Sequence, residues 1–442
     1  MSAARLLGIF LAVAMLPAHA QDLLRIYRDA KSYDAQYASA RYALQAGLEK
    51  LPQGRALLLP TLNATVGDTT NHLGLEPYGQ NPVFRSARPF YNHNYQLTFA
   101  QPIFRPQNWA QSDQGEQQVR QAEATFGQAA QDLIVRTAQA YFDVLAAQDT
   151  LALVQAQKVA ISEQLAQAKR NFEVGTATIT DTHEAQARYD LAVSQEIAAQ
   201  SDLEAKRKAL SQITGKDYPS LRPLRAQVTL SSPTPANVDE WVALTQKQAY
   251  PVAIQEAAMQ IANLQTKFAH AGHYPTVDLV ASYGQTWQTG STLTATSSQI
   301  NVGSVGLQLA VPIYQGGAIS SREREAAANY EKSKQDLENA RRTSVLQTQQ
   351  SFLAVINGVA QVKALEQALV SSQSALDSNK LGYEVGVRIN IDVLNAQQQL
   401  FSTRRDLAVA RYNTITAHLR LKAAAGSLRE EDLEEVNRAL EP

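Results

Sequence analysis

The residues best suited to chemistry are charged side chains in a line of sequence that occurs twice. FEVGTATITD at 172–181 returns as YEVGVRINID at 383–392. The first copy ends on Asp181 and the second on Asp392, and the second also contains Arg388. A guanidinium can pair with carboxylates, while carboxylates gathered around a symmetry axis repel one another and attract cations. This chemistry is electrostatic, so it can hold or gate a structure.

Patterns for catalysis or metal binding are weak. His270 and His273 stand three residues apart, but no cysteine or acidic ligand lies close to them in the sequence. The chain contains no cysteine at all, and we find no zinc-protease helix motif, phosphate-binding loop or serine elbow. We therefore expect no enzyme, no metal site and no cofactor.

The composition and the first residues predict an exported protein. The formal net charge of the 442 residues is −1, so we expect no nucleic-acid partner. Residues 1–20 combine Arg5, an apolar run at 6–16 and Ala18-His19-Ala20, as in a secretory signal peptide cleaved before Gln21. No cysteine follows the cleavage site, so no lipid anchor is expected. No later apolar run approaches the roughly 20 residues of a membrane-crossing helix, whereas membrane strands would give only a weak signal.

The chain follows one plan twice, and the repeated line is displaced by 383 − 172 = 211 residues. Leu59-Pro60-Thr61-Leu62 likewise corresponds to Tyr274-Pro275-Thr276-Val277. We interpret this as an internal duplication. The predicted divisions are a signal peptide at 1–20, a first repeat at 21–215, a connecting equatorial segment at 216–240, a second repeat at 241–427 and a C-terminal equatorial segment at 428–442.

Each repeat is predicted to contain a helix, two strands and two long helices. YNHNYQLTFAQ at 91–101 alternates apolar or aromatic with polar residues, as a strand between apolar and wet surroundings does. From Phe126 to Ala168 every seventh residue is apolar, which predicts supercoiled helices. The alternation slips near Gly303-Ser304, which indicates a bulge. The predicted helices are 22–57, 106–173, 181–214, 315–384 and 392–425, with a further helix opening the second repeat, and the predicted strands are about 61–70, 91–101, 276–285 and 299–311.

The strand lengths and the long helices predict an assembly of several copies. A strand of about 10 residues rises roughly 33 Å and, tilted by about 45°, crosses the apolar layer of a bilayer. A sheet in lipid cannot leave edges open, because each unpaired backbone group costs several kcal/mol. Known membrane barrels begin at about eight strands, so copies of the chain must share their strands. A helix over 106–173 would be about 100 Å long. The pattern leaves a dimer, a trimer or a larger ring open.

In both copies of the repeated line, a long helix ends at Val-Gly and another begins a few residues later. Gly175 and Gly386 fit the glycine that terminates a helix. Asp181 stands three residues before Glu184, which predicts a capping pair at the start of the next helix, and Asp392 has the corresponding place. Each copy therefore predicts a turn between two helices at one end of a rod.

The chain resembles the TolC-type outer-membrane factors, the exit ducts of Gram-negative efflux pumps and type I secretion systems. The most specific match is GYEVGVRINIDVLN at 382–395 with ARYN at 410–413, and further matches are ITD at 179–181 and ITG at 213–215 with Tyr218-Pro219. The resemblance covers essentially the whole mature chain. It implies a mainly α fold with β: a homotrimer with four strands per chain in a transmembrane β-barrel of 12 strands, continued by a coiled-coil α-helical barrel across the periplasm.

The resemblance also implies partners and site residues. A periplasmic adaptor and an inner-membrane transporter of RND, ABC or MFS type would dock on the duct. Asp392 maps to the acidic periplasmic aperture, and Asn395 stands where the family has a second acidic residue. By residue type alone, Asp181 and Asp392 fit helix caps, Tyr383 fits packing and Arg388 fits a solvated surface charge. Closed-state links map to Thr180, Asp181, Tyr383 and Arg388, and adaptor-docking turns map to Gly175, Thr176, Gly386 and Val387.

Two functions from different classes fit the sequence. The first is a passive conduit in the outer membrane, and the second is a secreted coiled-coil structural or adaptor protein with a soluble β domain. Tyr91, Tyr95 and Phe99 on one face of a strand favour the lipid-facing barrel. Drug, protein and metal export are equally compatible with the sequence.

Overall fold

The computed structural model describes residues 21–75, 86–176, 178–225, 228, 230–291 and 296–441, so the predicted signal peptide lies outside the described residues. The chain divides into two compact units, which we call the helical unit and the sheet unit. Each unit takes segments from both predicted repeats. The helical unit comprises Met1–Ser39, Ala129–Ala249 and Ser344–Pro442, and the sheet unit comprises Ala40–Gln128 and Tyr250–Thr343.

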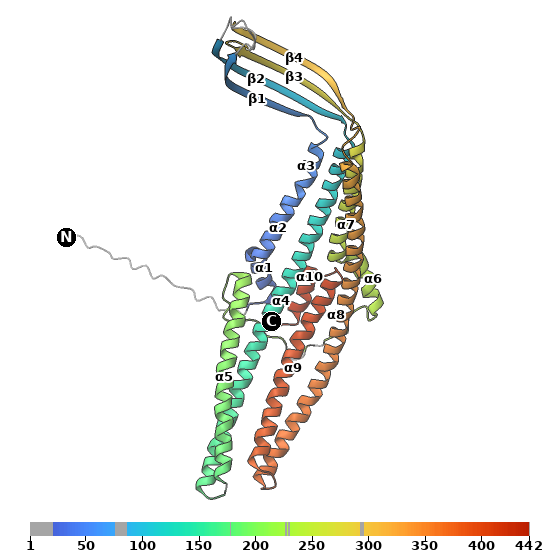
Figure 1. Cartoon of the computed structure of the whole chain (residues 1–442). Coiled ribbons are helices and arrows are strands. Elements are labelled where there is room, and N and C mark those ends of the chain that lie inside the picture. Colours follow the sequence, from blue (N-terminus) through green and yellow to red (C-terminus); the bar gives the residue numbers. More distant parts are fainter. Residues whose placement is uncertain are drawn as a thin grey trace, which may run out of the picture. The chain divides into compact units, whose positions relative to one another are not determined.

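The sheet unit contains an antiparallel sheet, which among the described residues has four strands in the order β1-β2-β3-β4 (Figure 1). All four predicted strands are present, and the first three are longer than predicted. Their alternating side chains explain why they form strands. The bounds are β1 Thr61–Leu75, β2 Ser86–Phe104, β3 Thr276–Gln288 and β4 Ser298–Ala310.

The strand register gives the sheet one largely apolar face and one polar face. Residues directly opposite each other on paired strands share a face, and Leu62 lies opposite Phe99. The aromatic residues that alternate along β2 therefore stand in line with apolar residues of β1 and β3. Apolar residues of this face that are exposed in the single chain are Leu62, Val66, Tyr91, Tyr95, Leu97 and Tyr283.

The predicted bulge near Gly303-Ser304 is wrong. β3 and β4 pair without a register shift along their whole lengths, and the shift that the sheet contains lies between Pro102 and Phe104 of β2. Successive residues of an unbroken strand point to opposite faces. The apolar residues before and after the slip in the sequence pattern therefore lie on opposite faces of the sheet. Val302 and Val305 consequently lie on opposite faces of β4.

The first predicted helix, at 22–57, is divided into α1 (Leu23–Tyr33), α2 (Ala35–Leu48) and α3 (Lys50–Ala56). Asp34 stands at the first break, where its carboxylate accepts a hydrogen bond from the Tyr37 N–H at 2.7 Å. The Arg136 guanidinium donates to the same carboxylate at 3.1 and 3.2 Å. Burial alone would raise the pKa of Asp34, but these hydrogen bonds outweigh burial and lower it. Asp34 thus ends one helix and starts the next.

The long helices form two pairs that run side by side, α4 with α5 and α8 with α9 (Figure 1). The helix α4 has the predicted bounds, and the other three begin and end within a few residues of prediction. In the seam of the first pair, Lys158 is neutralised by an ion pair with Glu196 of α5. The bounds are α4 Pro106–Glu173, α5 Ile179–Thr214, α8 Ala318–Glu384 and α9 Asn390–Ala424.

A large buried cluster of the helical unit lies where α1 and α10 (Glu430–Arg438) meet the long helices. Leu23 and Ile26 of α1, Leu133 of α4 and Leu433 of α10 are all 0% exposed. The apolar heptad positions explain this burial, because they bring one face of α4 against its neighbours. The second repeat opens with α6 (Val238–Gln248) and α7 (Tyr250–His270), and η1 (Ala271–His273) leads into β3.

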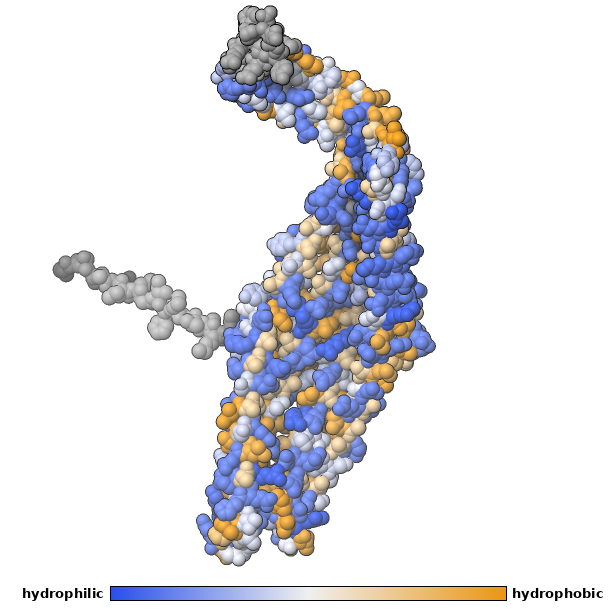
Figure 2. Space-filling view, viewed as in Figure 1, coloured by the Kyte–Doolittle hydropathy of each residue, from blue (hydrophilic) through white to orange (hydrophobic). Residues whose placement is uncertain are grey.

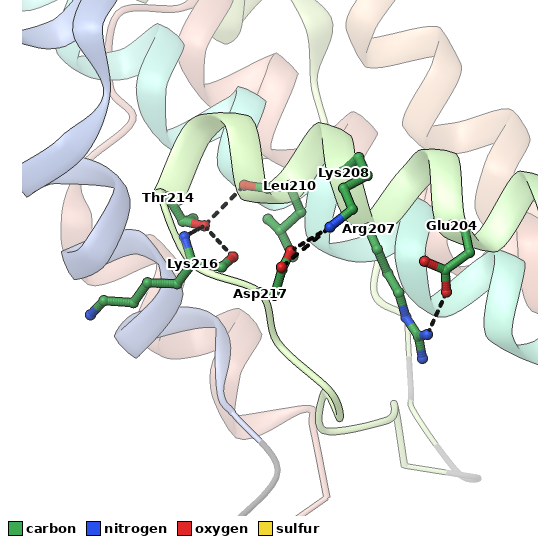
Figure 3. Close-up of polar contacts among 7 residues, drawn as sticks. All are labelled: Glu204, Arg207, Lys208, Leu210, Thr214, Lys216 and Asp217. Atoms are coloured by element: carbon green, nitrogen blue, oxygen red, sulfur yellow. Dashed lines mark hydrogen bonds and ion pairs between the residues drawn. The ribbon is translucent and has the colours of Figure 1, made fainter.

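The predicted connecting segment begins at residue 216, just after α5. Local polar contacts hold the chain there (Figure 3). The Thr214 hydroxyl donates to the Leu210 carbonyl at 3.0 Å and accepts from the Lys216 N–H at 3.4 Å. The Lys208 ammonium lies 3.2 Å from both carboxylate oxygens of Asp217. The Gly215 N–H also donates to the Ser211 carbonyl at 2.7 Å, which pairs one of the carbonyls that a helix end otherwise leaves open.

Among the described helices, α8 is long and apolar enough over part of its length to cross a membrane, as judged by composition alone. The expectation that no such run follows the signal peptide is therefore wrong by that measure. Phe352 and Val355 of α8 belong to a buried cluster with Trp241 of α6 and Leu421 of α9. These contacts with neighbouring helices account for apolar residues on α8.

Gly426 follows α9 with a φ of 74°, and a Cβ there would lie 2.2 Å from the Gln248 carbonyl oxygen. We expect Gly426→Ala to lower the free energy of unfolding by more than the roughly 1–2 kcal/mol that positive φ alone costs. Gly175→Ala is the matched control, because Gly175 has a φ of 76° and no atom within 4 Å of the added Cβ. Thermal unfolding in detergent measures both. Equal losses would contradict the clash.

Candidate functional site

The predicted site residues gather at two turns, one between α4 and α5 and one between α8 and α9. Gly175 and Gly386 adopt φ values of 76° and 79°. The Thr176 N–H donates to the Asn171 carbonyl at 2.8 Å, and the Val387 N–H donates to the Gly382 carbonyl at 2.9 Å. Each turn is thus a glycine-terminated helix end, as predicted, and the two glycines have the same left-handed conformation.

The capping pair of the first turn lies three residues earlier than predicted. Thr178 is the N-cap of α5, and its hydroxyl oxygen accepts the Asp181 N–H at 3.3 Å. The Asp181 carboxylate accepts the Thr178 N–H at 3.0 Å in return. The predicted pairing of Asp181 with Glu184 is therefore wrong, because the extended backbone of Thr178 places the helix start at Ile179.

The second turn has no such cap, although its sequence is similar. Ile389 is the N-cap of α9 and offers no side-chain hydrogen bond. Asp392 lies in the first turn of α9, where a negative charge is favourable, and it pairs with the Arg388 guanidinium at 3.6 Å. Arg388 is exposed, so this pair contributes about 0–1 kcal/mol. The second turn is consequently held less firmly than the first.

Tyr383 combines packing with a polar contact. Its ring packs against the buried cluster of Leu376, Val393 and Leu400. Its hydroxyl accepts a hydrogen bond from the Asn171 side-chain amide at 3.1 Å. Tyr383 therefore connects α8 to α4 close to the two turns.

Three of the four predicted link residues make other contacts within the described single chain. Asp181 lies in its capping box, Tyr383 contacts Asn171 and Arg388 contacts Asp392. Thr180 is exposed on the first turn of α5. Pairing of Arg388 with Asp181 stays a prediction that concerns an assembly of several copies.

The sequence interpretation missed Arg188 of α5. Its Nη2 donates to the Asn395 side-chain oxygen at 2.9 Å, and its Nη1 donates to the Gln398 side-chain oxygen. Leu394 lies beside these acceptors and packs into the buried cluster of α4 and α5. Asp392, Asn395 and Gln398 are spaced by three residues, so they lie on one side of α9. This spacing was the sequence signal for the side of α9 that Arg188 contacts.

Two buried amides in the first turns of α9 accept no hydrogen bond from the described residues. Asn390 and Gln397 are 4% and 5% exposed, and the side-chain oxygen of each is without a donor. A buried acceptor left unpaired costs about 1–3 kcal/mol. The packed arrangement at the start of α9 therefore carries a cost that its few polar links must offset.

Exposed apolar side chains flank the predicted docking residues Gly175, Thr176, Gly386 and Val387. Val174 and Val387 are 73% and 76% exposed. Figure 2 shows apolar surface close to the ends of both helix pairs. Apolar side chains gathered at the surface are suited to contact with another protein. Further exposed apolar residues there are Ile179, Val385 and Ile389.

The two histidines lie in the sheet unit around Glu323. The His270 Nδ1 and the His273 Nε2 lie 2.9 and 3.3 Å from the two carboxylate oxygens of Glu323. These contacts lower the pKa of Glu323, first through the hydrogen bond from His270. Among the residues that the structure describes, no group of three or more His, Cys, Asp or Glu side chains is arranged to hold a metal.

A sheet with an apolar face, combined with pairs of very long helices joined by short turns, defines a subunit of a barrel-forming channel. The family model described as Outer membrane efflux protein matches residues 26–216 and 243–427. This chain belongs to the outer membrane efflux protein family.

Known proteins similar to this chain are channel and secretion proteins. Outer membrane protein TolC of Vibrio cholerae is 33% identical over 423 residues, which is 95% of this chain and 94% of that protein. Proteases secretion protein PrtF of Dickeya chrysanthemi is 32% identical over 435 residues, or 97% and 93% of the two chains. The crystal structure of outer membrane protein VceC from Vibrio cholerae has the same fold, with a TM-score of 0.77 at 18% identity over 92% of this chain and 96% of that one.

These findings confirm the predicted family, the α-barrel and β-barrel fold class and the outer-membrane location. The chain provides an outer-membrane duct for efflux or type I secretion. The alternative of a soluble coiled-coil adaptor protein is not favoured.

The capping box of the first turn can be tested with the variants Thr178→Ala and Asp181→Ala. We expect each to destabilise the start of α5 by about 1 kcal/mol, since one backbone N–H loses its acceptor. Hydrogen exchange of the amides at 179–182 should then be about fivefold faster. Ile389→Thr is the reciprocal control and should slow exchange at the start of α9. Unchanged exchange in all three variants would contradict the capping assignment.

Proposed function

We propose that three copies of this chain form one tube, whose strands close a shared β-barrel of 3 × 4 = 12 strands in the outer membrane. The observation that carries this proposal is the sheet itself: among the described strands, β1 and β4 each lack a partner at their outer edge. Lipid cannot supply that partner, so neighbouring copies must. The paired helices would close a coiled-coil barrel in the periplasm.

The tube acts as a passive conduit, not as an enzyme, and receives its cargo from an inner-membrane transporter through a periplasmic adaptor. The exposed Val174 and Val387 support this, because apolar side chains at the two turns would be covered by an adaptor. The docking residues are Gly175, Thr176, Gly386 and Val387. Purification from native membranes should recover an adaptor and a transporter with the chain, and Val387→Asp should abolish their recovery. Recovery of the chain alone from wild-type membranes would overturn these partners.

At the inner end, Asp392 from each copy would line the aperture, with Asn395 one helical turn further along α9. Arg388 moderates the repulsion between these carboxylates, because it lies 3.6 Å from Asp392 of its own chain. Thr180, Asp181 and Tyr383 would complete the contacts between neighbouring turns in the closed state. Exposed links of this kind are weak. A docked partner can therefore break them and shift the channel away from the closed state.

We expect Arg388→Ala to raise the single-channel conductance in planar bilayers, since it removes the cation that pairs with Asp392. Asp181→Ala should raise the conductance as well. The change should be largest for cations and should shrink at high salt, where exposed charges are screened. Arg405→Ala is the control, because Arg405 is an exposed arginine that contacts its neighbour Asp406. Unchanged conductance in both gate variants would refute these roles.

A further inference from the structure

The contacts that hold the α8/α9 pair to the α4/α5 pair near the turns are few. Leu394 inserts into the cluster of α4 and α5, Tyr383 accepts from Asn171, and Arg188 donates to two residues of α9. By contrast, the core near α1 and α10 is built from fully buried side chains. The two pairs can therefore separate at the turns while that core stays packed.

The Arg188 contact joins a permanent charge to neutral partners. A guanidinium presents a rigid fork of donors and stays protonated at any physiological pH. Its two acceptors are the side-chain oxygens of Asn395 and Gln398, which lie one helical turn apart on α9. Hydrogen bonds with one charged partner are stronger than those between neutral groups. The fork thus fixes both the position and the rotation of α9 relative to α5.

We propose that Arg188 is a positioning residue that sets the resting width of the aperture through Asn395 and Gln398. The inference rests on the proposed function, because it assigns a regulation to the same tube. Asn395 is a neutral acceptor, so Arg188 holds α9 without adding a carboxylate to the aperture. The unpaired buried oxygens of Asn390 and Gln397 work against the packed state, so the balance depends on this fork.

The test compares Arg188→Gln, Asn395→Asp and the double variant by single-channel recording in symmetrical potassium chloride. Arg188→Gln should raise the mean conductance about two- to fivefold, as expected for loss of partly exposed links. Asn395→Asp should lower it while Arg188 is present, because the hydrogen bond becomes an ion pair. In the Arg188→Gln background the same substitution should raise it, because the new carboxylate is unpaired and repels Asp392.

Arg207→Gln is the matched control, since Arg207 lies on α5 and pairs locally with Glu204 at 2.9 Å. It should leave the conductance unchanged, and the far-ultraviolet circular dichroism and apparent mass of all variants should match the wild type. Asn395→Asp should thus change the conductance in opposite directions in the two backgrounds. An arginine with only a structural role would not give this result.

The inference falls if wild-type channels conduct and Arg188→Gln conducts equally, or if Asn395→Asp acts in the same direction in both backgrounds. A wild-type protein that forms no channel at all would overturn the proposed function, and this inference with it. The two failures are therefore distinguishable in one series of recordings.

Discussion

The backbone at the edge of a β-sheet must be paired when the sheet lies in lipid, and the rest of this structure depends on that constraint. The described sheet has four strands and therefore two edges, at β1 and β4. A barrel closed by several copies removes both edges at once. In the proposed assembly, closure around an axis would bring identical copies of each helix turn together, so a single acidic residue such as Asp392 would form a ring of charge. The proposed aperture would then be a consequence of the way the strands are closed.

The distribution of packing along the helical unit matches this arrangement. Fully buried side chains such as Leu133 and Tyr141 hold the helices where α1 and α10 pack. Near the turns, the contacts between helix pairs among the described residues include Leu394 and a few partly exposed polar links. Local stability within one protein spans a wide range, and regions that move are taken from its low end. Weak contacts near the turns, combined with a firmly packed core at α1 and α10, would allow the proposed opening without unfolding.

Much of the fold could be predicted from the sequence, because strands and coiled coils depend on short periodicities. Alternation indicated strands, although it was interrupted in the fourth, and the heptad rows indicated the long helix α4. Helix breaks that depend on a single side chain were missed. One example is Asp34, whose carboxylate caps α2 within a stretch that the sequence pattern predicts as one continuous helix. The start of α5 was misplaced because Thr178, not Asp181, has the extended backbone of an N-cap. The three-residue spacing on α9 marks the acceptors but not Arg188 itself, since Arg188 lies on another helix, 207 residues before Asn395.

The most direct test of the shared tube uses the absence of cysteine from the sequence. Thr65→Cys on β1 is combined in turn with Val302→Cys, Ser304→Cys or Gly306→Cys on β4, which share its face of the sheet, and native membranes are then oxidised. A trimer with closed edges predicts that at least one combination yields a covalent product of three chains and nothing larger. Products that remain single chains in every combination, or that extend without limit, would contradict the account.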